Sequence, residues 1–458
     1  MTTKKYDFDY LVIGSGPAGT TAALELARRK KQVGIVEGRY FGGANLNLRD
    51  VPYKVALDSV HNYYQMTTRP EIRAKDASFS LPSLASERLK AIIATGGGST
   101  KEFEAARVKC IKGYANLIDE HTVAVGDKKY TATNIILATG SRLKTLGITG
   151  VETVKYLSPD TAIMIRRLPK VVAVVGAGST GCEIAEFYAE LGVNTILLET
   201  AERILPKEDK EAGETLSSYF SRELGMTVVT GARVVALAED EVSKQVIFRF
   251  GNSEKIVRVE AIVLATGSEP VMDYGLENAG VKYRNSGIVV DKYFQTTAKN
   301  IYAIGDVLGN ESSTERAVSE GMTLATNLTE RTKTALNYKG MVRVTETWPE
   351  IATVGLNEDD LIRRDRGAQK ILVPVSETVA GKIHELRYGF VKIMADKNGH
   401  ILGATIMAPG ASAMAAEIAV AIRHNLTVLE IASTPHQIND YNYMVKLATK
   451  RLAKSYIR

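Results

Sequence analysis

The stretch Tyr10-Leu11-Val12-Ile13-Gly14-Ser15-Gly16-Pro17-Ala18-Gly19 decides the fold of the N-terminal part of the chain. Its apolar run ends at a glycine turn, a helical pattern follows over Thr20–Arg29, and a second apolar run covers Val33–Val36. A strand, a glycine turn, a helix and a strand in this order predict a βαβ unit. The three glycines allow a tight turn, close approach of a pyrophosphate to backbone N–H groups, and close helix–strand packing.

The same order returns about 160 residues later. The apolar run Val171–Val175 leads into Gly176-Ala177-Gly178-Ser179-Thr180-Gly181, and Val193–Leu198 follows as a second apolar run. Each motif has an acid 23 residues after its first glycine, Glu37 and Glu199. A carboxylate at that position can accept the ribose hydroxyls of an adenosine. Two copies with matched acids favour two dinucleotide sites over tight turns without a ligand.

The second acid bears on the choice of nicotinamide. Glu199 would repel a 2′-phosphate, for which an arginine is the usual partner. Arg203, four residues later, could partly offset that repulsion. The sequence therefore favours NAD(H) over NADP(H).

Composition limits the remaining possibilities. A chain of 458 residues predicts two to three domains. The net charge is +6, but the basic residues are scattered among 52 acidic ones, so we expect no nucleic-acid partner. No apolar run reaches the roughly 18 residues that span a bilayer, and the N-terminus has no signal-peptide pattern. We therefore expect a cytoplasmic protein. The six histidines are dispersed without metal-ligand spacing, so no metal site is expected.

Beyond the two motifs, the pattern indicates a third, α+β domain. Upstream of it, Glu87–Ala94 is an amphipathic helix broken by Thr95–Thr100, and Lys112–Gly140 is a short antiparallel meander ending in the strand Ile135–Leu137. Past Met341 the expected elements are the strands Ile371–Val375, Phe390–Ile393 and Ile401–Ile406 and the Ala-rich helix Ser412–Arg423.

Four further motifs carry a family resemblance. They are Ala138-Thr139-Gly140, Ala265-Thr266-Gly267, Tyr302-Ala303-Ile304-Gly305-Asp306 and Trp348-Pro349-Glu350-Ile351-Ala352-Thr353-Val354-Gly355. Together with the glycine motifs, they make nearly the whole chain resemble the FAD-dependent pyridine nucleotide–disulfide oxidoreductases, the family of lipoamide dehydrogenase, glutathione reductase and mercuric reductase. The resemblance implies a glutathione reductase-like α/β fold, with two Rossmann-like dinucleotide-binding domains, a C-terminal α+β dimerisation domain, and a homodimer.

The resemblance also implies the domain limits and the cofactor contacts. The FAD-binding domain would comprise residues 1–150 and 275–338, the NAD(H)-binding domain 151–274, and the dimerisation domain 339–458. FAD would contact Gly14, Gly16, Pro17, Ala18, Gly19, Glu37, Gly43, Ala44, Thr139, Gly140, Gly305 and Asp306. Of these, Asp306 would bind the ribityl chain. NAD(H) would contact Gly176, Gly178, Gly181, Glu199 and Gly267.

The sequence departs from the family at the redox motif, GGTCLNVGCIPSK. Here residues 42–54 read GGANLNLRDVPYK, and Asn45 and Asp50 stand at the places of the two cysteines. Neither residue can form a disulfide or attack one as a thiolate. Cys110 and Cys182, the only cysteines, lie elsewhere and are expected to be buried packing residues. Disulfide reduction and mercuric reduction of the family type are therefore excluded.

The C-terminal acid–base motif, HPHPTLSE in the family, has changed as well. His436 keeps the key histidine, but Tyr441 stands where the partner glutamate would be, and Asp440 is one residue off. Since the dyad serves proton transfer to the thiols, its loss agrees with the loss of the cysteines. His436 could still donate a proton, or it could merely pack at the interface.

Two flavin-facing residues are retained. Lys54 and Glu183 match the family's pair beside flavin N5, where a cation helps to hold the reduced flavin. The alternative is an ion pair kept for packing. Where the family often has an aromatic residue, Ser179 would leave the nicotinamide face more open.

The residues therefore predict an NADH:acceptor flavin oxidoreductase. NADH would reduce FAD, and electrons would pass directly to a non-disulfide acceptor, such as a quinone or a dye, on the opposite face. Asp50, Tyr53 and His436 could line that pocket, although Asp50 could equally be solvated or paired with Arg49. Two alternatives stay open: a soluble NAD(P) transhydrogenase, and a flavin-bound regulatory or binding protein with little turnover.

Overall fold

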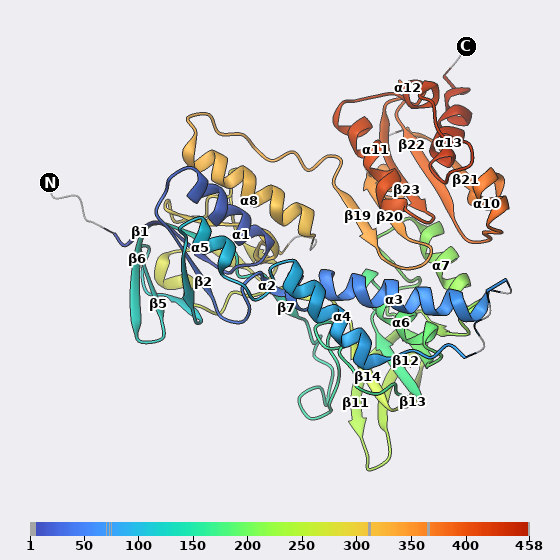
Figure 1. Ribbon diagram of the computed structural model, residues 1–458, viewed down its shortest axis with the longest axis horizontal. Helices are drawn as coiled ribbons and strands as arrows, with labels where there is room; N and C mark the ends of the chain where they lie inside the picture. Colours follow the sequence, from blue (N-terminus) through green and yellow to red (C-terminus); the bar gives the residue numbers. More distant parts are fainter. Residues whose placement is uncertain are drawn as a thin grey trace. The chain divides into compact units, whose positions relative to one another are not determined.

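The computed structural model describes residues 6–69, 71–72, 74, 76–309, 313–363 and 367–456 (Figure 1). The chain divides into two compact units. The first unit comprises residues 1–55, 82–144 and 267–338, and the second comprises residues 56–81, 145–266 and 339–458. Among the described residues, no helix combines the length and the apolar character that crossing a bilayer requires.

A seven-stranded sheet forms the centre of the first unit, in the order β3-β2-β1-β6-β5-β4, with β18 also paired to β6. Its strands are β1 (Phe8–Ile13), β2 (Val33–Glu37), β3 (Lys109–Lys112), β4 (Ala115–Leu117), β5 (Thr122–Val125), β6 (Lys128–Leu137) and β18 (Ile301–Ala303). The β4–β5–β6 part is antiparallel, which confirms the expected meander. The second half of β6 pairs in parallel with β1 and β18.

The parallel register brings the functional turns to one edge. Ile13 pairs with Val36 and Leu137, and Leu137 pairs with Ala303. The carboxyl ends of β1, β2, β6 and β18 therefore lie together, which is where open α/β sheets bind ligands. The turns that follow these strands, among them the one at Gly14, begin at this edge of the sheet.

Helices complete the first unit. They are α1 (Pro17–Arg28), α2 (Gly43–Asn47), α4 (Leu81–Ala94), α5 (Lys101–Ala105) and α8 (Thr314–Thr329), and α3 (Asp50–Thr68) continues into the second unit. The break after Ala94 lies where Thr95–Thr100 predicts it. Helix α8 packs closely on α1, because a Cβ on Gly321 would lie 2.6 Å from the Ala18 carbonyl oxygen. The short elements are β7 (Ser141–Leu143), β15 (Ser268–Pro270), β16 (Tyr283–Arg284), β17 (Gly287–Ile288), η1 (Leu276–Ala279) and η2 (Gly305–Leu308).

The second unit contains the second βαβ unit. A parallel sheet in the order β10-β9-β8-β14 is built from β8 (Val171–Val175), β9 (Asn194–Leu198), β10 (Thr227–Val229) and β14 (Ala261–Leu264). The associated helices are α6 (Ser179–Glu190) and α7 (Lys210–Arg222). An antiparallel sheet comprises β11 (Ala232–Glu239), β12 (Lys244–Phe250) and β13 (Ser253–Val259).

The C-terminal part of the second unit is the expected α+β domain. Its antiparallel sheet, in the order β19-β20-β23-β22-β21, comprises β19 (Val342–Thr345), β20 (Ile351–Gly355), β21 (Gln369–Pro374), β22 (Phe390–Ala395) and β23 (Ile401–Met407). Its helical elements are α9 (Glu358–Arg363), η3 (Val375–Glu377), α10 (Val379–Ile383), α11 (Ala411–Arg423), α12 (Val428–Ser433) and α13 (Tyr443–Ala453).

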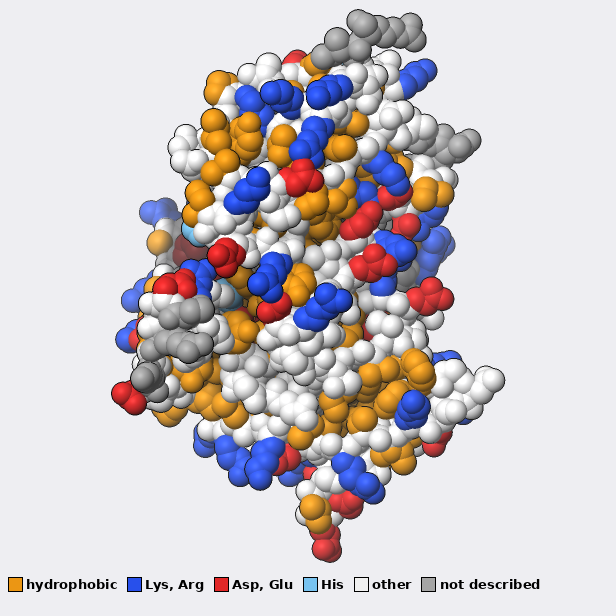
Figure 2. All heavy atoms as spheres, turned by 90° about the vertical axis from the view of Figure 1, so that its right-hand side faces the viewer, with side chains coloured by type: hydrophobic (Ala, Val, Ile, Leu, Met, Phe, Trp, Pro, Cys, Tyr) orange, Lys and Arg blue, Asp and Glu red, His pale blue; other side chains and the backbone are white. Residues whose placement is uncertain are grey.

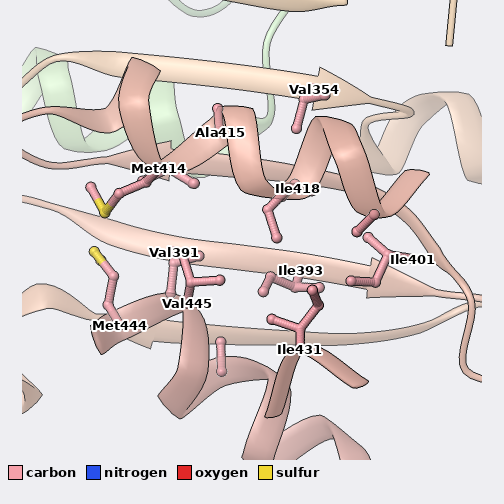
Figure 3. Close-up of a cluster of buried hydrophobic side chains, with 14 of the residues drawn as sticks. Val354, Val391, Ile393, Ile401, Met414, Ala415, Ile418, Ile431, Met444 and Val445 are labelled. Carbon is pink, nitrogen blue, oxygen red and sulfur yellow. The ribbon is translucent and has the colours of Figure 1, made fainter. Parts of the chain in front are cut away.

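An apolar core holds this domain together. Helix α11 packs on β19, β20 and β23, and α13 packs on β21 and β22. Figure 3 shows side chains of both helices gathered with those of β22, among them Met414, Ile418, Met444, Val445, Val391 and Ile393. The Ala-rich helix predicted from the sequence thus supplies one wall of a continuous core.

The charged surface agrees with the composition. On the face in Figure 2, Lys and Arg side chains lie among Asp and Glu side chains rather than in one basic stripe.

Candidate active site

The first glycine turn fits a pyrophosphate. A Cβ on Gly14 would overlap the carbonyl oxygen of Ala138, and one on Gly19 would overlap that of Gly14. A Cβ on Gly16 would meet no protein atom within 4 Å. The outer glycines are therefore required by the protein's own packing, and the middle glycine keeps the helix N-terminus open to a ligand. Helix α1 begins directly after Gly16, so its first N–H groups are available to an anion.

Gly43 supports the same turn. It has a φ of +66°, and a Cβ on it would lie 2.5 Å from the Cα of Gly16. The close approach of α2 to the turn therefore requires glycine at this position.

The second glycine turn repeats the first. Side chains on Gly176 and Gly181 would overlap the carbonyl oxygens of Ala265 and Gly176, whereas a Cβ on Gly178 would meet nothing within 4 Å. Helix α6 begins at Ser179, directly after the middle glycine. The two turns, one in each unit, thus have the same packing and the same open helix N-terminus.

The two acids are held in the same way. Glu37 accepts hydrogen bonds from the N–H and the hydroxyl of Ser15, at 3.0 and 2.7 Å, and from the N–H of Arg39 at 2.6 Å. Glu199 accepts from the N–H groups of Ala177 at 2.7 Å and Ala201 at 2.8 Å. Each carboxylate is therefore fixed beside its glycine turn, and its remaining lone pairs can accept ribose hydroxyls.

Arg203 is committed elsewhere. Its guanidinium donates to Asp359 at 3.0 Å and to the carbonyl oxygens of Pro206 and Glu208 at 3.3 Å each. The possibility that Arg203 offsets the charge of Glu199 therefore finds no support in this geometry.

The ATG turns follow β6 and β14 as the resemblance implies. Gly140 and Gly267 have φ values of +73° and +90°, and a Cβ on either would meet no protein atom within 4 Å. The hydroxyl of Thr139 donates to the carbonyl oxygen of Val271 at 3.0 Å. No protein atom therefore covers the backbone of either glycine on the side where a side chain would lie, as is also the case at Gly16 and Gly178.

A polar cluster occupies the position of the absent cysteines. The Asp50 carboxylate, at the first residue of α3, accepts hydrogen bonds from the Asn45 amide and from the Thr314 hydroxyl at 2.5 Å. Asn45 also donates to the Thr314 hydroxyl at 2.7 Å. Asp50 is exposed, as the solvated alternative expects, and it is also bonded within this cluster. Thr314, the first residue of α8, carries no sequence signal for this role.

The two cysteines lie apart from this cluster and are not paired. Cys110 is half-buried in β3 of the first unit, and Cys182 is fully buried in α6 of the second. Burial raises the pKa of the Cys110 thiol, and raises that of Cys182 well above its ordinary value. Cys182 fits the predicted packing role, whereas Cys110 is only partly enclosed. Neither environment produces a reactive thiolate.

The two residues predicted to face the flavin lie on two helices. Lys54 is exposed on α3, next to the buried Tyr53, and Glu183 lies on α6. Glu183 accepts hydrogen bonds from the Ser179 hydroxyl at 3.1 Å and from the Glu346 N–H at 2.9 Å. The Ser179 hydroxyl also lies 2.8 Å from that of Thr345. The pairing of Lys54 with Glu183 stays a prediction.

His436 has a carboxylate partner that the sequence did not reveal. Its Nε2 lies 3.1 Å from Glu417 Oε2, and its Nδ1 lies 2.9 Å from the carbonyl oxygen of Thr434. The prediction that His436 lacks a carboxylate is therefore wrong, because Glu417 of α11 lies within hydrogen-bond distance of its ring. Since a carbonyl oxygen only accepts, Nδ1 carries a hydrogen, and both ring nitrogens are engaged within this chain.

Among the described residues, one group of three carboxylates lies close enough together to bind a cation. It comprises Asp209, Glu211 and Glu358. The buried ammonium of Lys392 contacts all three residues, so a lysine already occupies the centre of the group.

Comparisons with known proteins agree with the fold and the motifs. The family model described as pyridine nucleotide-disulphide oxidoreductase matches residues 8–321, and its dimerisation domain matches residues 341–438. Dihydrolipoyl dehydrogenase of Geobacillus stearothermophilus is 30% identical over 93% of this chain and 92% of its own. Mercuric reductase of Bacillus cereus is 28% identical over 94% of this chain and 69% of its own.

Solved structures give the same result. The crystal structure of LpdA from Mycobacterium tuberculosis superimposes with a TM-score of 0.87, at 26% identity over 97% of this chain and 99% of that one. These similarities, together with the two glycine turns and the unpaired cysteines, confirm the glutathione reductase-like fold. The chain therefore belongs to the pyridine nucleotide–disulphide oxidoreductase family of flavoprotein enzymes, which bind FAD and NAD(P)H, and it lacks the redox-active cysteine pair.

Proposed function

We propose that this protein is an NADH:acceptor oxidoreductase that delivers electrons from its flavin directly to a non-disulfide acceptor, such as a quinone. When bound, FAD supplies two-electron transfer between the nicotinamide and the acceptor. The observation that carries the proposal is the Asn45–Asp50–Thr314 cluster, which fills the position of the redox cysteines with hydrogen-bonded, redox-inert side chains.

The chain's own residues divide the remaining tasks. The turn at Gly16 and Glu37 would bind the FAD pyrophosphate and ribose, and Asp306 would bind the ribityl chain. The turn at Gly178 and Glu199 would bind NADH. Glu199, fixed by two N–H groups, and Arg203, engaged with Asp359, support NAD(H) over NADP(H).

The acid–base step is revised by the geometry of His436. In this chain, Nε2 of His436 lies 3.1 Å from Glu417 and Nδ1 lies 2.9 Å from the Thr434 carbonyl oxygen, so donating a proton to an acceptor would require His436 to give up one of these contacts. We assign His436 to holding the segment after α12 against α11, and we infer that the acceptor takes its protons from solvent. The Asn45–Asp50–Thr314 cluster, in which Asp50 is exposed, would then line the approach of the acceptor.

The dimerisation domain supports a homodimer. Exposed apolar side chains in this domain include Val379, Ile383, Val420 and Ile438. A second copy of the chain would cover such side chains, as in obligate dimers. Sedimentation equilibrium measures the stoichiometry directly.

The test of the proposed function is NADH oxidation by the FAD-loaded protein with separate acceptors: menadione, benzoquinone, ferricyanide, lipoamide, glutathione disulfide and NADP⁺. We expect turnover with quinones and none with the disulfides. The matched control is the Cys110→Ser/Cys182→Ser variant, whose quinone activity should equal that of the wild type. Disulfide reduction that is present in the wild type and abolished in this variant would show that a thiol acts, and would refute the proposal.

Two other outcomes would point to the alternative functions. Rapid turnover with NADP⁺ alone would identify a transhydrogenase, and absence of flavin reduction by NADH would favour a regulatory role.

A further inference from the structure

The turn that carries Asp306 is held by a buried carboxylate behind it. The N–H of Gly305, at the start of η2, donates to Glu320 Oε2 at 2.7 Å. Glu320 lies on α8 and is 0% exposed, so it is inaccessible to a ligand. Gly305 has a φ of +78°, a conformation that favours glycine, so the turn is specified by the residue type as well as by this hydrogen bond.

The other oxygen of Glu320 is neutralised within the first unit. Oε1 accepts hydrogen bonds from the Arg316 Nε at 2.7 Å and from the Tyr338 hydroxyl at 3.0 Å. The Arg316 guanidinium also lies 4.9 Å from the centre of the Tyr338 ring. Burial, and then the charge of Glu320, raises the pKa of Tyr338 to about 12, so the hydroxyl remains a donor at neutral pH. A buried carboxylate with these partners is a rigid acceptor.

The aspartate next to Gly305 is held by a second residue. Asp306 Oδ2 accepts a hydrogen bond from the Ser141 hydroxyl at 2.9 Å. Its carbonyl oxygen accepts from the N–H of Gly309, also at 2.9 Å. The turn therefore has two supports, Ser141 on the side chain of Asp306 and Glu320 on the preceding N–H.

We propose that Glu320 is a positioning residue for the flavin: through the Gly305 N–H, it fixes the backbone turn that presents Asp306 to FAD. The inference rests on the proposed function only in that FAD binds at Asp306, and it is independent of the acceptor. Glu320 touches neither FAD nor substrate, so its effect on FAD affinity passes through Asp306.

A double-mutant cycle tests this route. The variants are Glu320→Gln, Asp306→Asn and their combination, and the measurement is the Kd of FAD for the flavin-stripped full chain, from quenching of flavin fluorescence. We expect Glu320→Gln to weaken FAD binding about tenfold, because a neutral amide oxygen accepts the Gly305 N–H more weakly than a carboxylate does. In the Asp306→Asn background, the same change should alter the Kd less than twofold.

Two further variants complete the design. Tyr338→Phe removes a hydrogen bond to Oε1 but leaves the contact with Gly305, and should change the Kd less than twofold. If Glu320→Gln does not fold, Glu320→Asp keeps the charge but is one methylene too short to reach Gly305, and should weaken FAD in the same cycle. An unchanged Kd, or equal effects with and without Asp306, overturns the proposal. Failure of the wild-type chain to bind FAD would instead refute the proposed function.

Discussion

At the scale of single residues, the exchange of two cysteines for Asn45 and Asp50 places a carboxylate where relatives can carry a thiol. Asp50 is exposed and is bonded to Asn45 and Thr314. A fixed negative charge at this position favours neutral acceptors over anionic ones, because like charges repel during the encounter.

Replacing Asp50 tests this charge effect. We expect Asp50→Asn to raise kcat/KM for ferricyanide about two- to fivefold at low salt, the effect of about 0.5–1 kcal/mol of removed repulsion near the surface. Neutral menadione should be unaffected. The matched control is Asp127→Asn, an exposed acid in the turn after β5. Equal increases for both acceptors, or an increase that persists at 1 M salt, would show that Asp50 acts by another route.

Replacing Glu199 tests the nicotinamide site. Its carboxylate is fixed by the N–H groups of Ala177 and Ala201. Glu199→Gln should lower kcat/KM for NADH about tenfold, because a charge-assisted hydrogen bond to the ribose is lost. It should also narrow the preference for NADH over NADPH. Steady-state kinetics with both nucleotides measure the ratio, and an unchanged ratio would remove Glu199 from nucleotide selection.

At the scale of elements, α6 is joined to its neighbours by a row of carboxylates at positions 183, 186 and 190. Glu183 accepts from the Glu346 N–H at 2.9 Å, and Glu186 accepts from the Trp348 N–H at 3.0 Å. Glu190 lies 2.7 Å from His61 Nδ1, and the His61 ring lies 4.3 Å from that of Trp348. One helix face is thus bound to α3 and to the segment after β19.

The middle member of the row predicts a pH dependence of stability. Burial, and then the charges of Glu190 and Glu183, raises the pKa of Glu186 well above its ordinary value. The ordinary pKa of a glutamate is 4.5, so above this pH the folded state binds more protons than the unfolded state. The contribution of Glu186 to the free energy of unfolding therefore falls as the pH rises above 4.5. Glu186→Gln should consequently raise the melting temperature more at pH 8 than at pH 5. Glu214→Gln, at an exposed site on α7, serves as control; equal shifts at both pH values would contradict the pKa assignment.

At the scale of the whole molecule, one buried lysine joins the C-terminal domain to the second dinucleotide domain. Lys392 of β22 is 1% exposed and contacts Asp209 at 3.3 Å, Glu211 at 2.8 Å and Glu358 at 2.5 Å. Burial alone would lower the pKa of Lys392, but its bonds to Glu211 and Glu358 raise it above the ordinary value. Three acids around one buried cation make this contact sensitive to loss of the lysine.

Lys392→Met should destabilise the folded chain by about 3–5 kcal/mol, because it leaves the buried Asp209 carboxylate without its counter-ion. The matched control is Lys370→Met, which also removes a partner of Glu358 but at a side chain 55% exposed. That change should cost less than about 1 kcal/mol. Urea unfolding followed by circular dichroism measures both, and equal midpoints would show that the buried cluster contributes little.

The sequence by itself determined the two βαβ units, the α+β domain and the absence of a dithiol. These features depend on short-range patterns: glycines at fixed offsets, apolar runs of strand and helix length, and the kinds of residue at positions 45 and 50. Such patterns constrain the backbone directly, so α11 begins within one residue of its predicted start.

Only the tertiary structure decided which side chains meet. Glu417 replaces the missing partner of His436, Thr314 joins Asp50 across 264 residues, and Glu320 supports the turn at Gly305. A carboxylate or hydroxyl can serve any donor within reach, and the reach is set by how helices pack on sheets rather than by spacing along the chain. For this reason the motifs could predict the cofactor sites, whereas the contacts of His436, Asp50 and Gly305 followed from the packing of α8 and α11.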